Sequence, residues 1–221
     1  MSAPEIVLLN GNTTAAMTAW LVSAAAPLAP PGLSVRGVTA PFGAPYVSDP
    51  AAYALAADAI AAMARALAAR PPAAAVIACF GDPGLWTARA ALPCPVIGMA
   101  EASLHAACQI GRRVGVVTGG PAWRPMLEAF VAEAGLSSRL AGVRALPLTG
   151  AEIAADPVAA TQGQRAAAAD LAAGGADVVI LGGAGLVGLA PAVGEGLGVR
   201  VLCSLACAMA QAGAAVALAR G

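Results

Sequence analysis

The side chain best placed for chemistry in this sequence is the thiol of Cys79. It follows the short apolar run 75–78, which predicts a buried strand, and it precedes the turn Phe80-Gly-Asp-Pro-Gly84. In an open α/β sheet, ligands bind beyond the carboxyl ends of the strands. A thiolate is favoured near a helix N-terminus, where free N–H groups also hold anions. We therefore interpret Cys79 as a candidate reactive group. The alternative is a small buried hydrophobe, as most free cysteines are.

The composition excludes several competing chemistries. The chain has 221 residues and no lysine, since all 12 of its basic residues are arginine. This excludes a lysine Schiff base, and with it ordinary pyridoxal-phosphate chemistry, and a P-loop lysine. One histidine and five cysteines without a C-x-x-C pair predict no zinc site. A net charge of zero gives no basic patch for nucleic acid.

Two features bear on the compartment. The first residues lack the basic and apolar regions of a signal peptide, and the odd number of cysteines without disulfide-like spacing indicates a reducing compartment. Residues 201–219 carry no charge and could imitate a membrane span, but most of them are small. We interpret this stretch as a strand that runs into a buried, alanine-rich helix. The prediction is a cytoplasmic protein that makes no membrane contact.

Strands and helices alternate along the chain. Apolar runs predict strands over 5–9, 33–39, 75–78, 95–98, 113–117, 143–146, 176–181 and 199–202. Helices are expected over 15–26, 50–70, 85–91, 101–109, 123–134, 157–174 and from about 204. The Asn and Thr side chains of 10–14 are expected to cap the first helix.

The second half of this pattern repeats the first. Asn10 corresponds to Thr118, 108 residues later, and Cys79 corresponds to Gly183, 104 residues later. The repeat predicts an α/β fold with two similar lobes, each with a four-stranded parallel sheet flanked by helices, related by a pseudo-twofold axis. Lobe 1 would comprise residues 1–100 and the C-terminal helix of about 204–221, and lobe 2 residues 101–203. Strand ends from both lobes would then meet in one cleft, the expected active site.

From end to end, the chain resembles the Asp/Glu racemase superfamily, and within it the hydantoin racemase branch, which is related to arylmalonate decarboxylase and maleate isomerase. The segments that carry the resemblance are Asn10–Thr14, Cys79–Leu85, Pro95–Ser103, Gly115–Thr118 and Ile180–Leu186. The resemblance implies chemistry without a cofactor at a carbon next to a carbonyl. It also implies two cysteines, one in each lobe, which flank the substrate carbon and exchange its proton.

Such chemistry needs a base near its working pKa and donors that stabilise an enolate oxygen. Cys79 would be the first-lobe base. The expected substrate-binding groups are the backbone N–H groups of Phe80, Gly81, Ala184 and Gly185, the side chains of Asn10, Asn12, Thr13 and Thr118, the strand-end Gly183, and Tyr46 in the loop that shapes the pocket. Helix capping for the Asn and Thr residues, and loop packing for Tyr46, are the structural alternatives.

The sequence departs from the family pattern at one position. The second-lobe cysteine falls on Gly183, which can neither donate nor accept a proton. Three hypotheses follow. Cys203, at the end of the next strand, replaces the missing cysteine. The enzyme works with one thiol, as arylmalonate decarboxylase does. The site has lost catalysis and only binds a small molecule.

The glycine motif of 183–188 also fits G-x-G-x-x-G, the dinucleotide signal. The next strand ends at Cys203 without an acidic residue for a ribose, so we predict no cofactor. The predicted function is a racemase or isomerase that moves a proton by a thiol on a hydantoin-like or amino-acid-like substrate. The alternatives are a single-cysteine decarboxylase and a non-catalytic binder. The expected partner is a small carboxylate or cyclic amide, and apolar helix faces predict a homo-oligomer.

Overall fold

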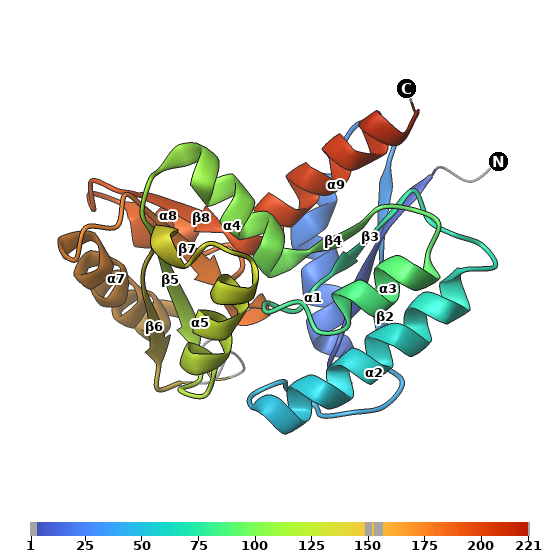
Figure 1. Ribbon diagram of the computed structural model, residues 1–221, viewed down its shortest axis with the longest axis horizontal. Coiled ribbons are helices and arrows are strands. Elements are labelled where there is room, and N and C mark those ends of the chain that lie inside the picture. Colours follow the sequence, from blue (N-terminus) through green and yellow to red (C-terminus); the bar gives the residue numbers. More distant parts are fainter. Residues whose placement is uncertain (1–3, 149–151, 153–156, 221) are drawn as a thin grey trace. The chain divides into compact units, whose positions relative to one another are not determined.

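The computed structural model describes residues 4–148, 152 and 157–220. The chain forms two compact units, coloured in sequence order in Figure 1. Unit 1 comprises Met1–Ala102 and Leu205–Gly221, and unit 2 comprises Ser103–Ser204.

Unit 1 is built on a parallel sheet with the strand order β2-β1-β3-β4. Its elements are β1 (Glu5–Asn10), α1 (Ala15–Ala25), the 3-10 helix η1 (Ala26–Leu28), β2 (Ser34–Thr39), α2 (Pro50–Leu67), β3 (Ala74–Ile77), α3 (Leu85–Ala91), β4 (Val96–Gly98), the first residues of α4 (Met99–Ile110) and nearly all of α9 (Ser204–Arg220). Leu9 pairs with Ile77, and Asn10 pairs with Thr39. The carboxyl ends of these strands therefore lie at one edge of the sheet.

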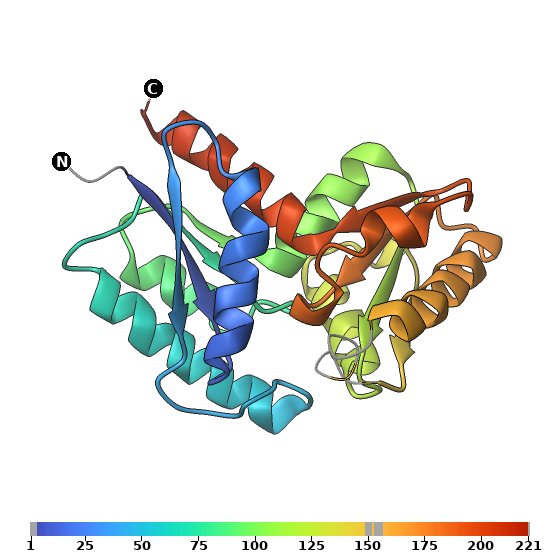
Figure 2. The same cartoon turned by 180° about the vertical axis from the view of Figure 1, so that it is seen from behind.

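Helices cover both faces of this sheet. Figures 1 and 2 show α1 on one face and α2 with α3 on the other. The core between the sheet and α2 and α3 is apolar because β1 and β3 contribute fully buried side chains and α2 contributes a buried stripe that includes Ile60 and Met63. Pro50 starts α2, and Asp49 caps it by accepting a 2.9 Å hydrogen bond from the Ala52 N–H.

Unit 2 repeats this arrangement, with the strand order β6-β5-β7-β8, again parallel throughout. Its elements are β5 (Val114–Gly119), α5 (Trp123–Glu133), η2 (Ser137–Arg139), β6 (Leu140–Leu146), α7 (Pro157–Ala173), β7 (Val178–Gly182), η3 (Ala184–Leu186), α8 (Ala190–Gly194) and β8 (Arg200–Cys203). Helix α7 lies on one face of the sheet and α5 on the other (Figures 1 and 2). The predicted α/β class with two four-stranded parallel sheets is confirmed.

Two local expectations have different outcomes. The uncharged stretch 201–219 does form strand β8 followed by helix α9, as predicted. Across the described part of the chain, no helix is both long enough and apolar enough to cross a membrane. The prediction that Asn and Thr side chains cap α1 is wrong. Thr14 precedes the helix but donates its hydroxyl to the Pro45 carbonyl at 2.7 Å, because the two segments lie against each other.

Candidate active site

Cys79 lies two residues beyond the end of β3, on a turn that leads to α3. Its side chain is partly buried and packs against the apolar cluster under α2 and α3. Two hydrogen bonds hold the turn: the Asp82 N–H donates to the Cys79 carbonyl at 3.0 Å, and the Tyr53 hydroxyl donates to the Gly81 carbonyl at 2.8 Å. Among the described residues, no hydrogen bond uses the N–H of Phe80 or Gly81. These two donors are thus available for a substrate oxygen.

The turn also carries a buried carboxylate that sequence reasoning missed. Asp82 is 3% exposed, and its φ of 57° lies in the left-handed region, which Asp tolerates better than most residues. Its Oδ1 accepts from the Ala100 N–H and its Oδ2 from the Glu101 N–H, both at 2.8 Å. Asp82 therefore caps the N-terminus of α4 from a distant part of the chain. A Cβ at Gly98 would overlap this carboxylate, so β4 must end in glycine.

The environment of the turn disfavours the Cys79 thiolate, whereas the sequence predicted that a thiolate would be favoured there. Burial, and then the charge of Asp82, raise the pKa of Cys79 to about 12. The expected stabilisation of a thiolate is therefore wrong: α3 begins only at Leu85, and both burial and the charge of Asp82 favour the thiol. Burial also raises the pKa of Asp82 to about 7, against the lowering effect of its two N–H donors. At neutral pH Cys79 is a protonated thiol, ready to donate a proton.

The Asn10 side chain lies at the carboxyl end of β1 but is fully engaged in the turn that follows. Its Nδ2 donates to Asn12 Oδ1 and to Thr18 Oγ1, each at 2.9 Å, and its Oδ1 accepts from the Asn12 N–H at 3.2 Å. Asn12 Oδ1 also accepts from the Thr14 N–H at 2.9 Å. Asn10 thus shapes this turn, while no hydrogen bond within the described ranges uses Asn12 Nδ2.

The loop after β2 is attached to the same turn. The Thr13 N–H donates to the Ala44 carbonyl at 3.0 Å, and two residues later the loop carries the half-buried Tyr46. The predicted groups of unit 1 therefore come together at one edge of its sheet: Asn10, Asn12, Thr13, Tyr46, Cys79, Phe80 and Gly81.

In unit 2 the corresponding edge carries Thr118 and Gly183. Thr118 is buried and pairs with Gly182, and Gly183 has a φ of 134°, a conformation that favours glycine. The Leu186 N–H donates to the Gly183 carbonyl at 3.1 Å, which reproduces the bond between Asp82 and Cys79. Within the described chain, the N–H groups of Ala184 and Gly185 have no hydrogen bond either. Unit 2 thus has the turn without the thiol or the carboxylate.

Comparison with known proteins identifies the family. The family model described as Asp/Glu/hydantoin racemase matches residues 6–212. This chain belongs to the Asp/Glu/hydantoin racemase family.

Individual relatives agree with this assignment. Hydantoin racemase of Paenarthrobacter aurescens is 32% identical over 216 residues, which cover 97% of this chain and 92% of that protein. The crystal structure of allantoin racemase from Pseudomonas fluorescens is 33% identical, with a TM-score of 0.90, and the match covers 97% of this chain and 92% of that one. A liganded variant of arylmalonate decarboxylase shares the fold at 22% identity, with a TM-score of 0.74 over 96% of this chain and 92% of that one. The chain is a racemase-like enzyme, as the resemblance predicted.

The position of Cys203 in this family member follows from the strand register. Cys203 pairs with Leu181 in unit 2, as Gly98 pairs with Ile77 in unit 1. Cys203 is therefore the counterpart of Gly98. It lies on the strand next to β7, beside Leu181, which comes two residues before Gly183. Its side chain packs against the apolar cluster under α7 and α8. The register does not place this thiol where the missing cysteine would lie.

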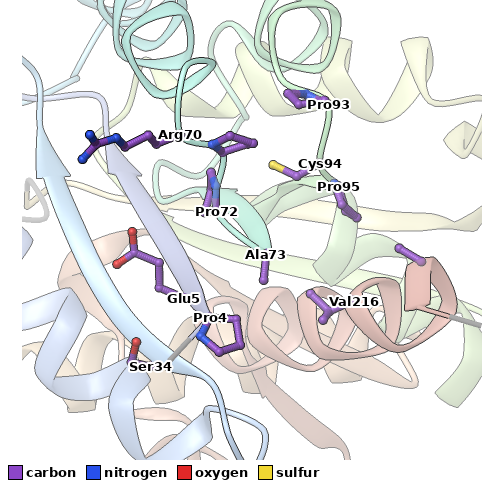
Figure 3. Close-up of a pocket in the computed structure, with 12 residues that line it drawn as sticks. Pro4, Glu5, Ser34, Arg70, Pro72, Ala73, Pro93, Cys94, Pro95 and Val216 are labelled. Atoms are coloured by element: carbon purple, nitrogen blue, oxygen red, sulfur yellow. The ribbon is translucent and has the colours of Figure 1, made fainter. Parts of the chain in front are cut away.

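The structure contains a cavity that lies away from the predicted site residues. It has a volume of about 770 Å³ and is lined by Glu5 and Ser34, the first residues of β1 and β2, and by Arg70 and Cys94 (Figure 3). It therefore opens at the amino-terminal edge of the unit 1 sheet, opposite the Cys79 turn, and contains none of the predicted site residues. In the residues that the structure describes, no group of His, Cys, Asp and Glu could hold a metal ion.

The position of the Asp82 carboxylate predicts that Gly98→Ala destabilises the protein by about 1–3 kcal/mol, because the methyl group would enter the space that the carboxylate fills. Urea unfolding measures this. Gly163→Ala in α7 is the matched control: its Cβ would make only a 3.9 Å contact with Leu146, so the change should stabilise by up to about 1 kcal/mol. Equal unfolding midpoints for Gly98→Ala and the parent would contradict the account of this turn.

Proposed function

We propose that this chain catalyses proton transfer at a carbon next to a carbonyl, without a cofactor, and that the sulfur of Cys79 carries the proton. One observation carries the proposal: a thiol at a strand end lies on a turn fixed by hydrogen bonds, and the next two N–H groups have no partner within the described residues. The absence of any lysine agrees with chemistry that needs no pyridoxal phosphate.

The proposed step follows from the protonation state of the thiol. The S–H bond of Cys79 breaks as its proton forms a C–H bond with an enolate carbon, which leaves a thiolate and a neutral substrate. The reverse step returns the proton to sulfur and regenerates the enolate. The N–H groups of Phe80 and Gly81 would stabilise the enolate oxygen, as preorganised donors do in other enolate-forming sites. Since the pKa of Cys79 is raised to about 12, protonation is the favoured direction.

The proposed substrate is a cyclic amide of the hydantoin type, whose ring carbon next to a carbonyl carries an acidic proton. Support for this class comes from relatives named hydantoin racemase and allantoin racemase, at 32% and 33% identity over nearly the whole chain. Small carboxylates that form an enolate by losing CO₂ would use the same thiol as proton donor. For a hydantoin, the thiolate form of Cys79 first takes the ring proton and the resulting thiol returns it, whereas a carboxylate that loses CO₂ needs only the thiol as donor.

Whether the reaction racemises its substrate depends on a second acid–base group, which the family resemblance implies at position 183. Gly183 offers no acid or base, and the register places Cys203 at the counterpart of Gly98. We therefore propose that proton transfer occurs on one face of the substrate only. Racemisation with Cys203 as the second thiol is the second candidate, which the overall similarity to racemases favours.

One-sided transfer predicts that, in D₂O, one pure enantiomer of a ring-substituted hydantoin exchanges its ring proton for deuterium and keeps its configuration. The rate above that of the enzyme-free control should rise about tenfold per pH unit from pH ~7 to ~9, because the thiolate fraction rises while pH stays below the pKa of about 12. Proton NMR and chiral chromatography measure exchange and configuration. Exchange of both enantiomers with loss of configuration would establish the two-thiol racemase instead.

A thiol introduced at position 183 should give the protein racemase activity. In Gly183→Cys the new Cβ would have Leu186 Cδ1 as its nearest neighbour at 3.8 Å, so space is available, although the φ of 134° should cost about 1–3 kcal/mol. We expect the variant to interconvert hydantoin enantiomers faster than the parent, as measured by polarimetry. Gly183→Ala is the control, since it introduces the same strain without sulfur and should not gain activity. An equal gain in both variants would show that the thiol is irrelevant.

A further inference from the structure

Two buried side chains of unit 2 carry polar atoms without a hydrogen-bond partner. Gln164, on α7, is 0% exposed, and neither its Oε1 nor its Nε2 has a partner in the part of the chain that the structure describes. The same holds for the Oγ of Ser204, the first residue of α9. Burying an amide or a hydroxyl without a partner costs free energy of folding, so these groups require an explanation.

Gln164 lies at the level where the strands of unit 2 end. Late in α7, Leu171 Cδ1 lies 3.0 Å from the position that a Cβ would take at Gly115, near the start of β5. Earlier in the helix, a Cβ at Gly163 would lie 3.9 Å from Leu146, which ends β6. The helix therefore runs antiparallel to the strands, and Gln164 lies at their carboxyl end. A helical side chain leans toward the N-terminus of its helix, which here means toward that edge.

The hydroxyl of Ser204 lies at the same edge of the sheet. Cys203 ends β8 and pairs with Leu181, so Ser204 comes level with Gly182, the last residue of β7. The turn that contains the unpartnered N–H groups described above begins directly after it. Both side chains with unpartnered polar atoms therefore lie at the edge of unit 2 where substrate-binding groups are predicted.

Neither side chain is charged, which bears on the ligand that they would bind. Arg165, the charged neighbour of Gln164 in the sequence, donates to the carbonyls of Ala192 and Val193 on α8. A carboxamide offers a donor and an acceptor in one plane, which matches the adjacent C=O and N–H of a cyclic amide, as it matches the edge of adenine in DNA. An ionised carboxylate only accepts, so it would leave Oε1 of Gln164 unpaired.

We propose that Gln164 determines substrate specificity: its carboxamide pairs with the C=O and N–H of a cyclic-amide substrate and so selects that class over small carboxylates. The rotatable bonds of the side chain let the carboxamide turn toward the strand ends when substrate binds, and such rotamer changes are common on binding. This role rests on the proposed function, since the ligand is its substrate. It predicts that loss of the carboxamide stabilises the free protein and weakens substrate binding, a combination that a purely structural glutamine would not produce.

The test combines urea unfolding with calorimetric titration of hydantoin into the full-length Gln164→Met variant, which keeps the length of the side chain without its polar atoms. The urea midpoint should rise, because an unpartnered amide leaves the core. The Kd for hydantoin should rise by about 10- to 100-fold, because one or two hydrogen bonds to the ligand are lost. Methylmalonate, a small carboxylate, should bind the parent at least about tenfold more weakly than hydantoin, and this preference should narrow in the variant.

Gln211→Met is the matched control. Gln211, on α9, donates its Nε2 to the Ala102 carbonyl at 2.9 Å, so its loss should lower the urea midpoint and leave the Kd for hydantoin unchanged. The proposal would be overturned if folded Gln164→Met bound hydantoin as the parent does, or if both Gln164→Met and Gln164→Leu lowered the midpoint. If the parent itself bound no hydantoin, the proposed function would fail, and this inference with it. The two failures are therefore distinguishable.

Discussion

The hydrogen bonds between the Asp82 carboxylate and the first N–H groups of α4 determine the geometry of the candidate site in unit 1. They require a glycine at position 98, a left-handed residue at position 82 and a turn that brings the Cys79 carbonyl to the Asp82 N–H. A helix N-terminus attracts negative charge, and its two N–H donors lower the pKa of Asp82, but burial outweighs them and raises that pKa to about 7. Burial, and then the same charge, raise the pKa of Cys79 to about 12. One contact thus links the fold of unit 1 to its chemistry.

The two units show how much of this geometry can change while the fold is kept. Their sheets have the same strand order, and their third strands end in turns with the same hydrogen bond. In unit 2 an apolar Leu186 cannot cap a helix, and Cys203 is the counterpart of Gly98, with its side chain packed against the cluster under α7 and α8. The replacements at these three positions are mutually compatible. Unit 2 thus has the same framework with a glycine at the position of Cys79.

Much of the fold could be predicted from the sequence, because strands and helices alternate clearly and each strand is a short apolar run. The placement of Cys79, Phe80 and Gly81 beyond a strand end followed from the same pattern. The role of Asp82 could not be predicted, since its hydrogen-bond partner Ala100 lies 18 residues away and the segment Asp-Pro-Gly is typical of any turn. The predicted stabilisation of the Cys79 thiolate is wrong because the pKa of the thiol is raised, first by burial and then by the charge of Asp82. Sequence spacing gives neither the burial of the turn nor the direction of the Asp82 side chain.

The central claim is that Cys79 carries the proton, and the most direct test is deuterium incorporation by Cys79→Ala at saturating hydantoin. The account predicts that exchange above the enzyme-free rate falls by about 10²- to 10⁴-fold, the usual contribution of a positioned acid–base group. Cys203→Ala, which removes the thiol that packs under α7 and α8, should retain the parental rate. If folded Cys79→Ala exchanged deuterium at the parental rate, a group other than Cys79 would carry the proton, and the account would be contradicted.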